Sequence, residues 1–114
     1  GRVRANVITI SSAISACEKR GQWERALQLL RGMLPEGLSP DVIVYNSAIS
    51  ACEKGEQWEQ ALSLLKELPN QRLKPDVVTY NSTLNACGRA SRWERAVHLL
   101  DEMLRQDVRP TAAL

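Results

Sequence analysis

Apolar side chains recur along the middle of the chain with the spacing of amphipathic helices. One set occupies positions i, i+3, i+4 and i+7: Tyr45, Ala48, Ile49 and Cys52. The spacing returns after a short polar break in a second set: Trp58, Ala61, Leu62 and Leu65. The alternation with period two that would indicate β-strands is absent. The pattern predicts a hairpin of two helices in an all-α fold.

The same pattern repeats every 35 residues, with no insertion or deletion. Three columns mark the period: Trp23, Trp58 and Trp93; Cys17, Cys52 and Cys87; Pro40, Pro75 and Pro110. One hairpin cannot bury its own apolar stripes, so neighbouring hairpins must stack to complete a core. The sequence therefore predicts an α-solenoid.

The period divides the chain into three complete units with partial units at both ends. The complete units are residues 7–41, 42–76 and 77–111; residues 1–6 close a preceding unit, and residues 112–114 begin a following one. We expect the chain to be an excerpt from a longer array. Terminal repeats generally need a polar cap. None is visible, so self-association through the end faces is expected.

Local signals place the helix boundaries within each unit. Asp41 and Asp76 each follow a proline and precede a first helix, where a carboxylate can cap free N–H groups. Ser91 with Glu94 predicts a capping box for the last second helix. The breaks between the two helices are expected at Gly21, at Gly55–Glu56 and at Ser91.

Composition narrows the class of protein without deciding its function. The chain has 114 residues, of which 44% are hydrophobic and 25% charged, an ordinary balance for a folded domain. No apolar run approaches the roughly 18 residues of a membrane span, so no membrane association is expected. The net charge of +2 permits a polyanionic partner without requiring one.

Catalytic and metal-binding chemistry has no support in the sequence. The three cysteines lie in the apolar stripe of successive first helices and are interpreted as small buried hydrophobes. His98 has no counterpart in the other units, so a solvated position is expected. No serine has a plausible His/Asp pair and no Gly-rich phosphate loop occurs. We expect no enzymatic activity, no metal and no cofactor.

Two kinds of side chain admit both a structural and a binding interpretation. The tryptophans could stack on bases, but each begins a second helix on its apolar face, so packing between the two helices is favoured. A basic residue also recurs in each unit near the end of the first helix: Lys19, Lys54 and Arg89. This basic column could bind a polyanion, or it could be a solvated face near helix C-termini, where cations are favourable.

Two polar columns are more informative. Ser11, Asn46 and Asn81 recur one turn into the first helices, and the units close on Asp41, Asp76 and Thr111. Donor and acceptor groups that recur once in every unit could form hydrogen bonds with the edges of successive bases. Capping aspartates beside solvated amides explain the same residues, and the residues alone leave both interpretations open.

The motifs P-D-V-I-V-Y-N-S at Pro40–Ser47 and P-D-V-V-T-Y-N-S at Pro75–Ser82 resemble the pentatricopeptide repeat (PPR) family. The resemblance covers essentially the whole chain. The tetratricopeptide repeat has 34 residues and opens with W-x-x-L-G-x-x-Y, which is absent. The resemblance implies a right-handed α-solenoid of the plain 35-residue class.

The resemblance also implies binding of single-stranded RNA, one base per repeat. The implied base-reading pairs are Ser11 with Asp41 for guanine, Asn46 with Asp76 for uracil, and Asn81 with Thr111 for a pyrimidine, in 5′ to 3′ order. The residues that would sandwich bases are Ile8, Ile43 and Val78. The basic column would face the phosphates.

Members of this family act mostly in chloroplasts or mitochondria, so the resemblance implies a role in organellar RNA processing, stability, editing or translation. The alternative is a protein–protein scaffold of tetratricopeptide type that holds a peptide in its groove. A third possibility is the targeting arm of an enzyme whose catalytic domain lies outside this sequence.

Overall fold

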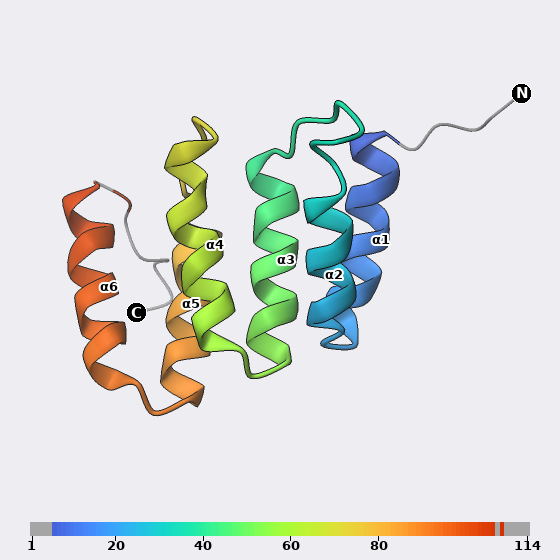
Figure 1. Cartoon of the computed structure of the whole chain (residues 1–114). Helices are drawn as coiled ribbons and strands as arrows, with labels where there is room; N and C mark the ends of the chain where they lie inside the picture. The colour runs from blue at the N-terminus through green and yellow to red at the C-terminus, as the bar shows by residue number, and fades with distance from the viewer. Residues whose placement is uncertain (1–5, 107, 109–114) are drawn as a thin grey trace, which may run out of the picture.

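In the computed structural model, which describes residues 6–106 and 108, the chain forms six helices in three successive hairpins (Figure 1). The helices are α1 (Val7–Lys19), α2 (Trp23–Arg31), α3 (Val42–Lys54), α4 (Trp58–Asn70), α5 (Val77–Arg89) and α6 (Trp93–Arg105). No strand occurs within this described part. The predicted all-α solenoid is confirmed.

The first helices of the three hairpins form one layer and the second helices form another (Figure 1). Neighbouring helices lie closer together in the first layer than in the second. In the first layer α3 contacts both α1 and α5, whereas α2 and α4 contact the first helices of their own and the next hairpin. Among the described residues, no Cα pair within 8 Å joins α2 to α4 or α4 to α6. The layer whose members approach more closely is the inner side of a curved stack, so α1, α3 and α5 form one continuous inner surface.

Side-chain caps begin the first helices, as predicted. The Asp41 carboxylate accepts from the Val44 N–H at 2.9 Å, and Asp76 accepts from the Thr79 N–H at 3.1 Å. Asn6 caps α1 in the same way. Each cap satisfies a backbone donor that has no partner within the helix.

The turns between the two helices of each hairpin depend on one left-handed residue. Gly21, Glu56 and Ser91 have φ angles of 65°, 61° and 58°. In the third hairpin the Ser91 and Arg92 N–H groups donate back to Gly88 and Cys87 at 3.0 and 2.8 Å, the Schellman pattern that ends α5.

The prediction of a capping box formed by Ser91 and Glu94 is wrong. The N-cap of α6 is Arg92, with no side-chain cap hydrogen bond. Because Ser91 must adopt the left-handed conformation that ends α5, it lies one residue too early to cap α6. The predicted positions of the breaks are nevertheless confirmed.

The core runs through all three hairpins. Met33, Leu68 and Met103 hold equivalent positions and are each 0% exposed. All three cysteines are free thiols; the predicted burial is confirmed for Cys52 and Cys87, whereas Cys17 is only half-buried. Burial raises the pKa of the Cys52 thiol to about 12, so it stays protonated and unreactive at neutral pH.

Trp23 and Trp58 contact the next hairpin as well as the core. A Cβ atom on Gly55 would lie 2.4 Å from Cδ1 of Trp23, so glycine is what lets this ring approach the following turn. The Arg92 guanidinium lies 5.2 Å from the centroid of the Trp58 ring, a cation–π distance. Trp93 is 68% exposed because no described element packs beyond α6.

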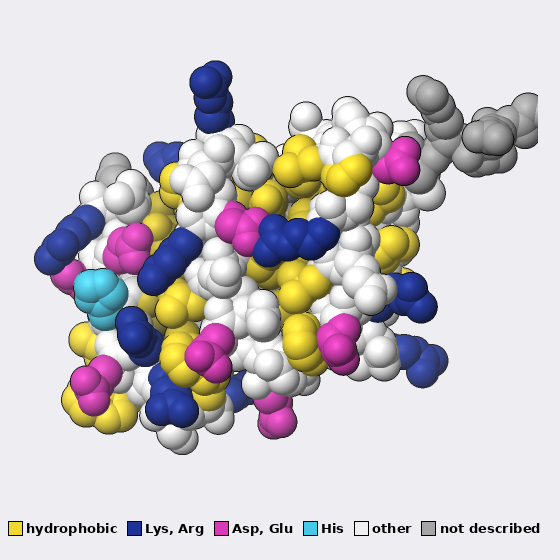
Figure 2. Space-filling view, in the orientation of Figure 1, with side chains coloured by type: hydrophobic (Ala, Val, Ile, Leu, Met, Phe, Trp, Pro, Cys, Tyr) yellow, Lys and Arg dark blue, Asp and Glu magenta, His cyan; other side chains and the backbone are white. Residues whose placement is uncertain are grey.

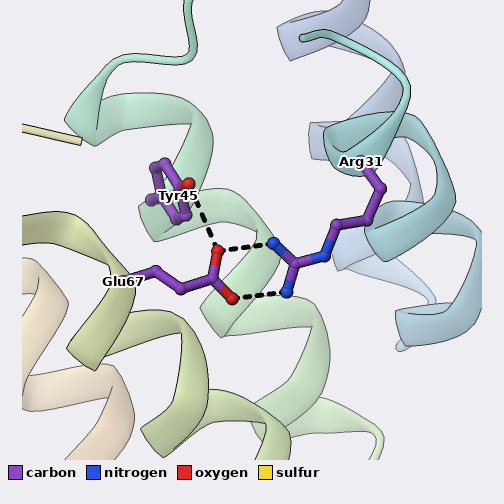
Figure 3. Close-up of polar contacts among 3 residues, drawn as sticks. All are labelled: Arg31, Tyr45 and Glu67. Carbon is purple, nitrogen blue, oxygen red and sulfur yellow. Dashed lines mark hydrogen bonds and ion pairs between the residues drawn. The ribbon is translucent and has the colours of Figure 1, made fainter. Parts of the chain in front are cut away.

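One ion pair joins the first two hairpins through their second helices. Both terminal nitrogens of Arg31 on α2 donate to the two carboxylate oxygens of Glu67 on α4, and the Tyr45 hydroxyl donates to Glu67 Oε1 at 3.4 Å (Figure 3). A bidentate pair with a third donor has a defined geometry, which isolated surface pairs lack.

We expect this pair to contribute measurably to stability. In a double-mutant cycle with Arg31→Ala and Glu67→Ala, followed by urea unfolding, the coupling should be about 1 kcal/mol and should fall with salt. The exposed pair of Arg105 with Asp101 at 2.8 Å is the control, with about 0.3–0.5 kcal/mol expected. A coupling no larger than that of the control would contradict this expectation.

Candidate functional site

A line of exposed aliphatic side chains runs along the inner layer of helices. Ile8, Ile43 and Val78 are the second residues of α1, α3 and α5, and they are 77%, 63% and 49% exposed. Single exposed hydrophobics are common and need no explanation. A branched aliphatic exposed at the same position of every first helix is a repeated surface feature, which the core does not require.

A recess of about 310 Å³ lies beside Ile43 and Val78. Its walls include Asn46 and Asp76, with Glu18 and Ser50 also in the lining. The volume is at the lower end of small-molecule pockets, which are roughly 300–1,000 Å³. A second recess, of about 560 Å³, is lined in part by Ser11, Lys19 and Ile43. Ile43 therefore contributes to both recesses.

The structure brings the polar pair of the middle unit into direct contact. The Asn46 side-chain nitrogen, from α3, donates to Asp76 Oδ1 at 3.0 Å, and Asp76 caps α5. Asn46 is only 8% exposed. The aspartate thus belongs to the turn before α5 and faces the preceding hairpin, which places an amide from one hairpin and a carboxylate from the start of the next in one recess.

The hydrogen bonds at this pair keep the Asp76 carboxylate charged. Burial alone raises the pKa of Asp76, but the Thr79 N–H, the Asn46 amide, the Thr79 hydroxyl and the Val78 N–H together outweigh it. The net result is a pKa below the ordinary value of 3.8. At neutral pH the recess therefore presents a carboxylate, which accepts hydrogen bonds and donates none.

Thr79 is a member of this cluster that the sequence analysis missed. Its hydroxyl donates to Asn46 Oδ1 at 2.5 Å and accepts from the Asp76 N–H at 3.1 Å. The sequence does contain a signal for its role in the helix cap, because a threonine three residues after a capping aspartate completes a reciprocal cap. Its contact with the preceding hairpin could not be found from local spacing.

The other two polar pairs differ from the middle one. Ser11 is half-buried and Asp41 exposed, and within the described residues no hydrogen bond joins them. A serine side chain is shorter than asparagine, and Val44 offers no hydroxyl where Thr79 stands in the next unit. Asn81 is half-buried. Its expected partner, Thr111, lies outside the described residues.

The basic column is exposed but partly neutralised. Lys54 Nζ lies 2.7 Å from Glu18 Oε2, and an Arg89 nitrogen lies 3.5 Å from Glu53 Oε2, so each cation pairs with the preceding hairpin. Lys19 is exposed as well. In both pairs the cation is exposed, whereas Glu18 is half-buried and Glu53 is buried.

The opposite face has no comparable order. Over α2, α4 and α6, side chains of both signs are intermixed with apolar ones (Figure 2). His98 is exposed on α6, as expected. Among the described residues, no group of three or more His, Cys, Asp or Glu side chains could hold a metal ion. In the same part of the chain, no helix is both long and apolar enough to cross a membrane.

Comparison with known proteins identifies the repeat. The model of the PPR repeat family matches residues 5–54, 40–89 and 75–113. The pentatricopeptide repeat protein PPR10 from maize is 30% identical and superposes with a TM-score of 0.86 over 96% of this chain and 16% of PPR10. The chain belongs to the pentatricopeptide repeat family. It spans about a sixth of the length of that relative.

Two further solved structures are similar. PPR10 in complex with an 18-nt psaJ RNA element has a TM-score of 0.84 at 30% identity, over 96% of this chain and 16% of that chain. The PPR domain of Arabidopsis thaliana protein-only RNase P 1 in complex with tRNA has a TM-score of 0.83 over 95% of this chain and 57% of that chain. At 14% identity, the latter is similar in fold alone. No curated protein sequence matches the chain.

The pKa of Asp76 predicts a specific acid sensitivity. Because the folded pKa is lowered, the carboxylate stabilises the fold fully above pH 3.8, and this contribution is lost as the pH falls through the lower folded value. Between about pH 5 and about pH 2, the free energy of unfolding should fall less in Asp76→Asn than in the parent. Asn85→Ser, which removes no carboxylate, should keep the parent's pH dependence. Identical profiles for Asp76→Asn and the parent would contradict the prediction.

Proposed function

We propose that the chain binds single-stranded RNA along α1, α3 and α5, with one base per hairpin. The observation that carries the proposal is the recess beside Ile43 and Val78, with Asn46 and Asp76 in its wall. Aliphatic side chains can cover both faces of a planar base, while the polar pair contacts its edge. Membership of the family and the RNA bound to the related PPR10 support the same assignment.

The chemistry of the middle recess favours uracil. Asn46 uses one N–H on Asp76, and its second N–H can donate to a uracil carbonyl. The Asp76 carboxylate can accept from the ring N–H beside that carbonyl. Cytosine presents an amino donor and a ring nitrogen without hydrogen at the same edge, so its pattern mismatches both groups.

The remaining base preferences rest on the family pattern. Ser11 with Asp41 corresponds to guanine, and Asn81 with Thr111 to a pyrimidine, which gives G-U-pyrimidine in 5′ to 3′ order over units 7–41, 42–76 and 77–111. Lys19 of the basic column lines one of the recesses and can contact a phosphate there.

We further propose that the chain is part of a longer array without catalysis of its own, acting on organellar RNA in its processing, stability, editing or translation. The exposed apolar residues of α6, which include Trp93 at 68% and Val97 at 60%, would contact the next hairpin of such an array. In an isolated chain the same face is available for self-association.

Salt dependence tests the proposal against a peptide-binding scaffold. When the chain is titrated with a short RNA containing G-U-C, contacts to about three phosphates should give log K against log salt a slope near −2. Affinity should be low, because each stacked base contributes about 1–3 kcal/mol before the cost of ordering the strand. Binding of peptides but not of this RNA would contradict the proposal.

A single substitution tests the base assignment. Asn46→Ser, with Asp76 kept, reproduces the pair of the first unit and should shift the middle preference from uracil towards guanine. Asn85→Ser on the exposed side of α5 is the matched control and should leave the preference unchanged. The measurement compares Kd values for RNAs that differ only at the middle base. If Asn46→Ser behaves like the control, the assignment is wrong.

A further inference from the structure

We propose that Thr79 is a positioning residue that makes the middle recess discriminate uracil from cytosine. The proposal rests on the proposed function and assigns a role to a side chain that itself touches no base. Thr79 is 0% exposed, in the first turn of α5, behind the Asn46–Asp76 pair. Its effect on RNA would therefore be exerted through Asn46.

The hydroxyl of Thr79 has one proton, and the geometry indicates where it goes. Asp76 Oδ1, at 3.0 Å, already accepts from the Thr79 N–H and from Asn46 Nδ2. Asn46 Oδ1 is closer, at 2.5 Å. A hydroxyl donates once, and its oxygen can still accept, here from the Asp76 N–H at 3.1 Å. The proton therefore belongs to the bond with Asn46.

This bond determines which group of the amide a base can reach. With Oδ1 directed towards Thr79 and one N–H towards Asp76, the second N–H of Asn46 is the group of the amide that can turn to a base. A donor beside the Asp76 carboxylate complements uracil. Without the hydroxyl, Oδ1 would have to turn outward to find a partner. An outward amide oxygen could accept from the amino group of cytosine, so discrimination would fall.

The chain contains its own comparison. Where the polar residue is Asn46, the supporting residue is Thr79; where it is Ser11, the equivalent residue is Val44; for Asn81 it is Leu114, which lies outside the described residues. An amide has two different ends and needs orienting, whereas a hydroxyl rotates to suit its partner. Val44 still lets Asp41 cap α3 through its N–H, so the threonine hydroxyl is not needed for the cap itself.

The test compares Kd for RNAs that carry uracil or cytosine at the middle base. Thr79→Val should lower the uracil-to-cytosine affinity ratio about fivefold, the factor of one ordinary hydrogen bond. Thr79→Ser retains the hydroxyl and should retain the ratio. Thr9→Val removes the equivalent hydroxyl from the cap of α1, where it donates to Asn6, and should also leave the ratio unchanged.

The outcomes separate this proposal from the proposed function. If the parent prefers uracil and Thr79→Val keeps the full preference, Thr79 has no positioning role while RNA recognition stands. If the parent does not bind RNA, both are wrong. Should Thr79→Val unfold, Thr79→Ala takes its place in the same comparison: a lowered uracil-to-cytosine ratio supports the proposal, and a ratio equal to that of Thr79→Ser overturns it.

Discussion

Everything in this molecule depends on the fact that a single hairpin cannot bury its own apolar face. Each first helix must pack on the next, as α3 does on α1 and α5, and the core continues from Met33 to Leu68 to Met103. Because the stacking keeps a constant register, any side chain repeated every 35 residues is aligned in space. The alignment of Ile8, Ile43 and Val78 is thus a consequence of core packing, which supplies at no further cost the regular spacing that a row of bases requires.

Stability and the proposed recognition of a base depend on the same atoms at the junction of two hairpins. Asp76 caps α5 through Oδ1, and that oxygen also accepts from Asn46 of the preceding hairpin. The cap therefore holds the carboxylate at a fixed place and in its charged form, as its lowered pKa indicates. Side chains fixed before a ligand arrives lose less entropy on binding. The ion pairs of Lys54 with Glu18 and of Arg89 with Glu53 likewise link neighbouring hairpins, and they position these two cations of the basic column.

The repeat, the helix type, the aspartate caps and the turn positions could all be predicted, because each follows from local spacing or from a short apolar period. Features that depend on contacts between units could not. Ser91 looked like a helix cap, but the end of α5 required it in a left-handed conformation. The hydroxyl of Thr79 reaches Asn46 on another hairpin, a contact that no local spacing indicates. The glycine at Gly55 is explained only by the Trp23 ring packed against it. The residues of the candidate site could be found because they recur every 35 positions. The side chains that contact them from the adjacent hairpin could not be found in this way.

The central claim is that one base occupies the space between the aliphatic residues of consecutive first helices. The most direct measurement is a set of intermolecular nuclear Overhauser effects in the complex of the chain with a G-U-C RNA. The account predicts contacts from the methyl groups of both Ile43 and Val78 to the ring protons of the same uracil. Contacts only to apolar residues of the second helices, such as Leu62 or Val97, or contacts of Ile43 and Val78 to different bases, would contradict it.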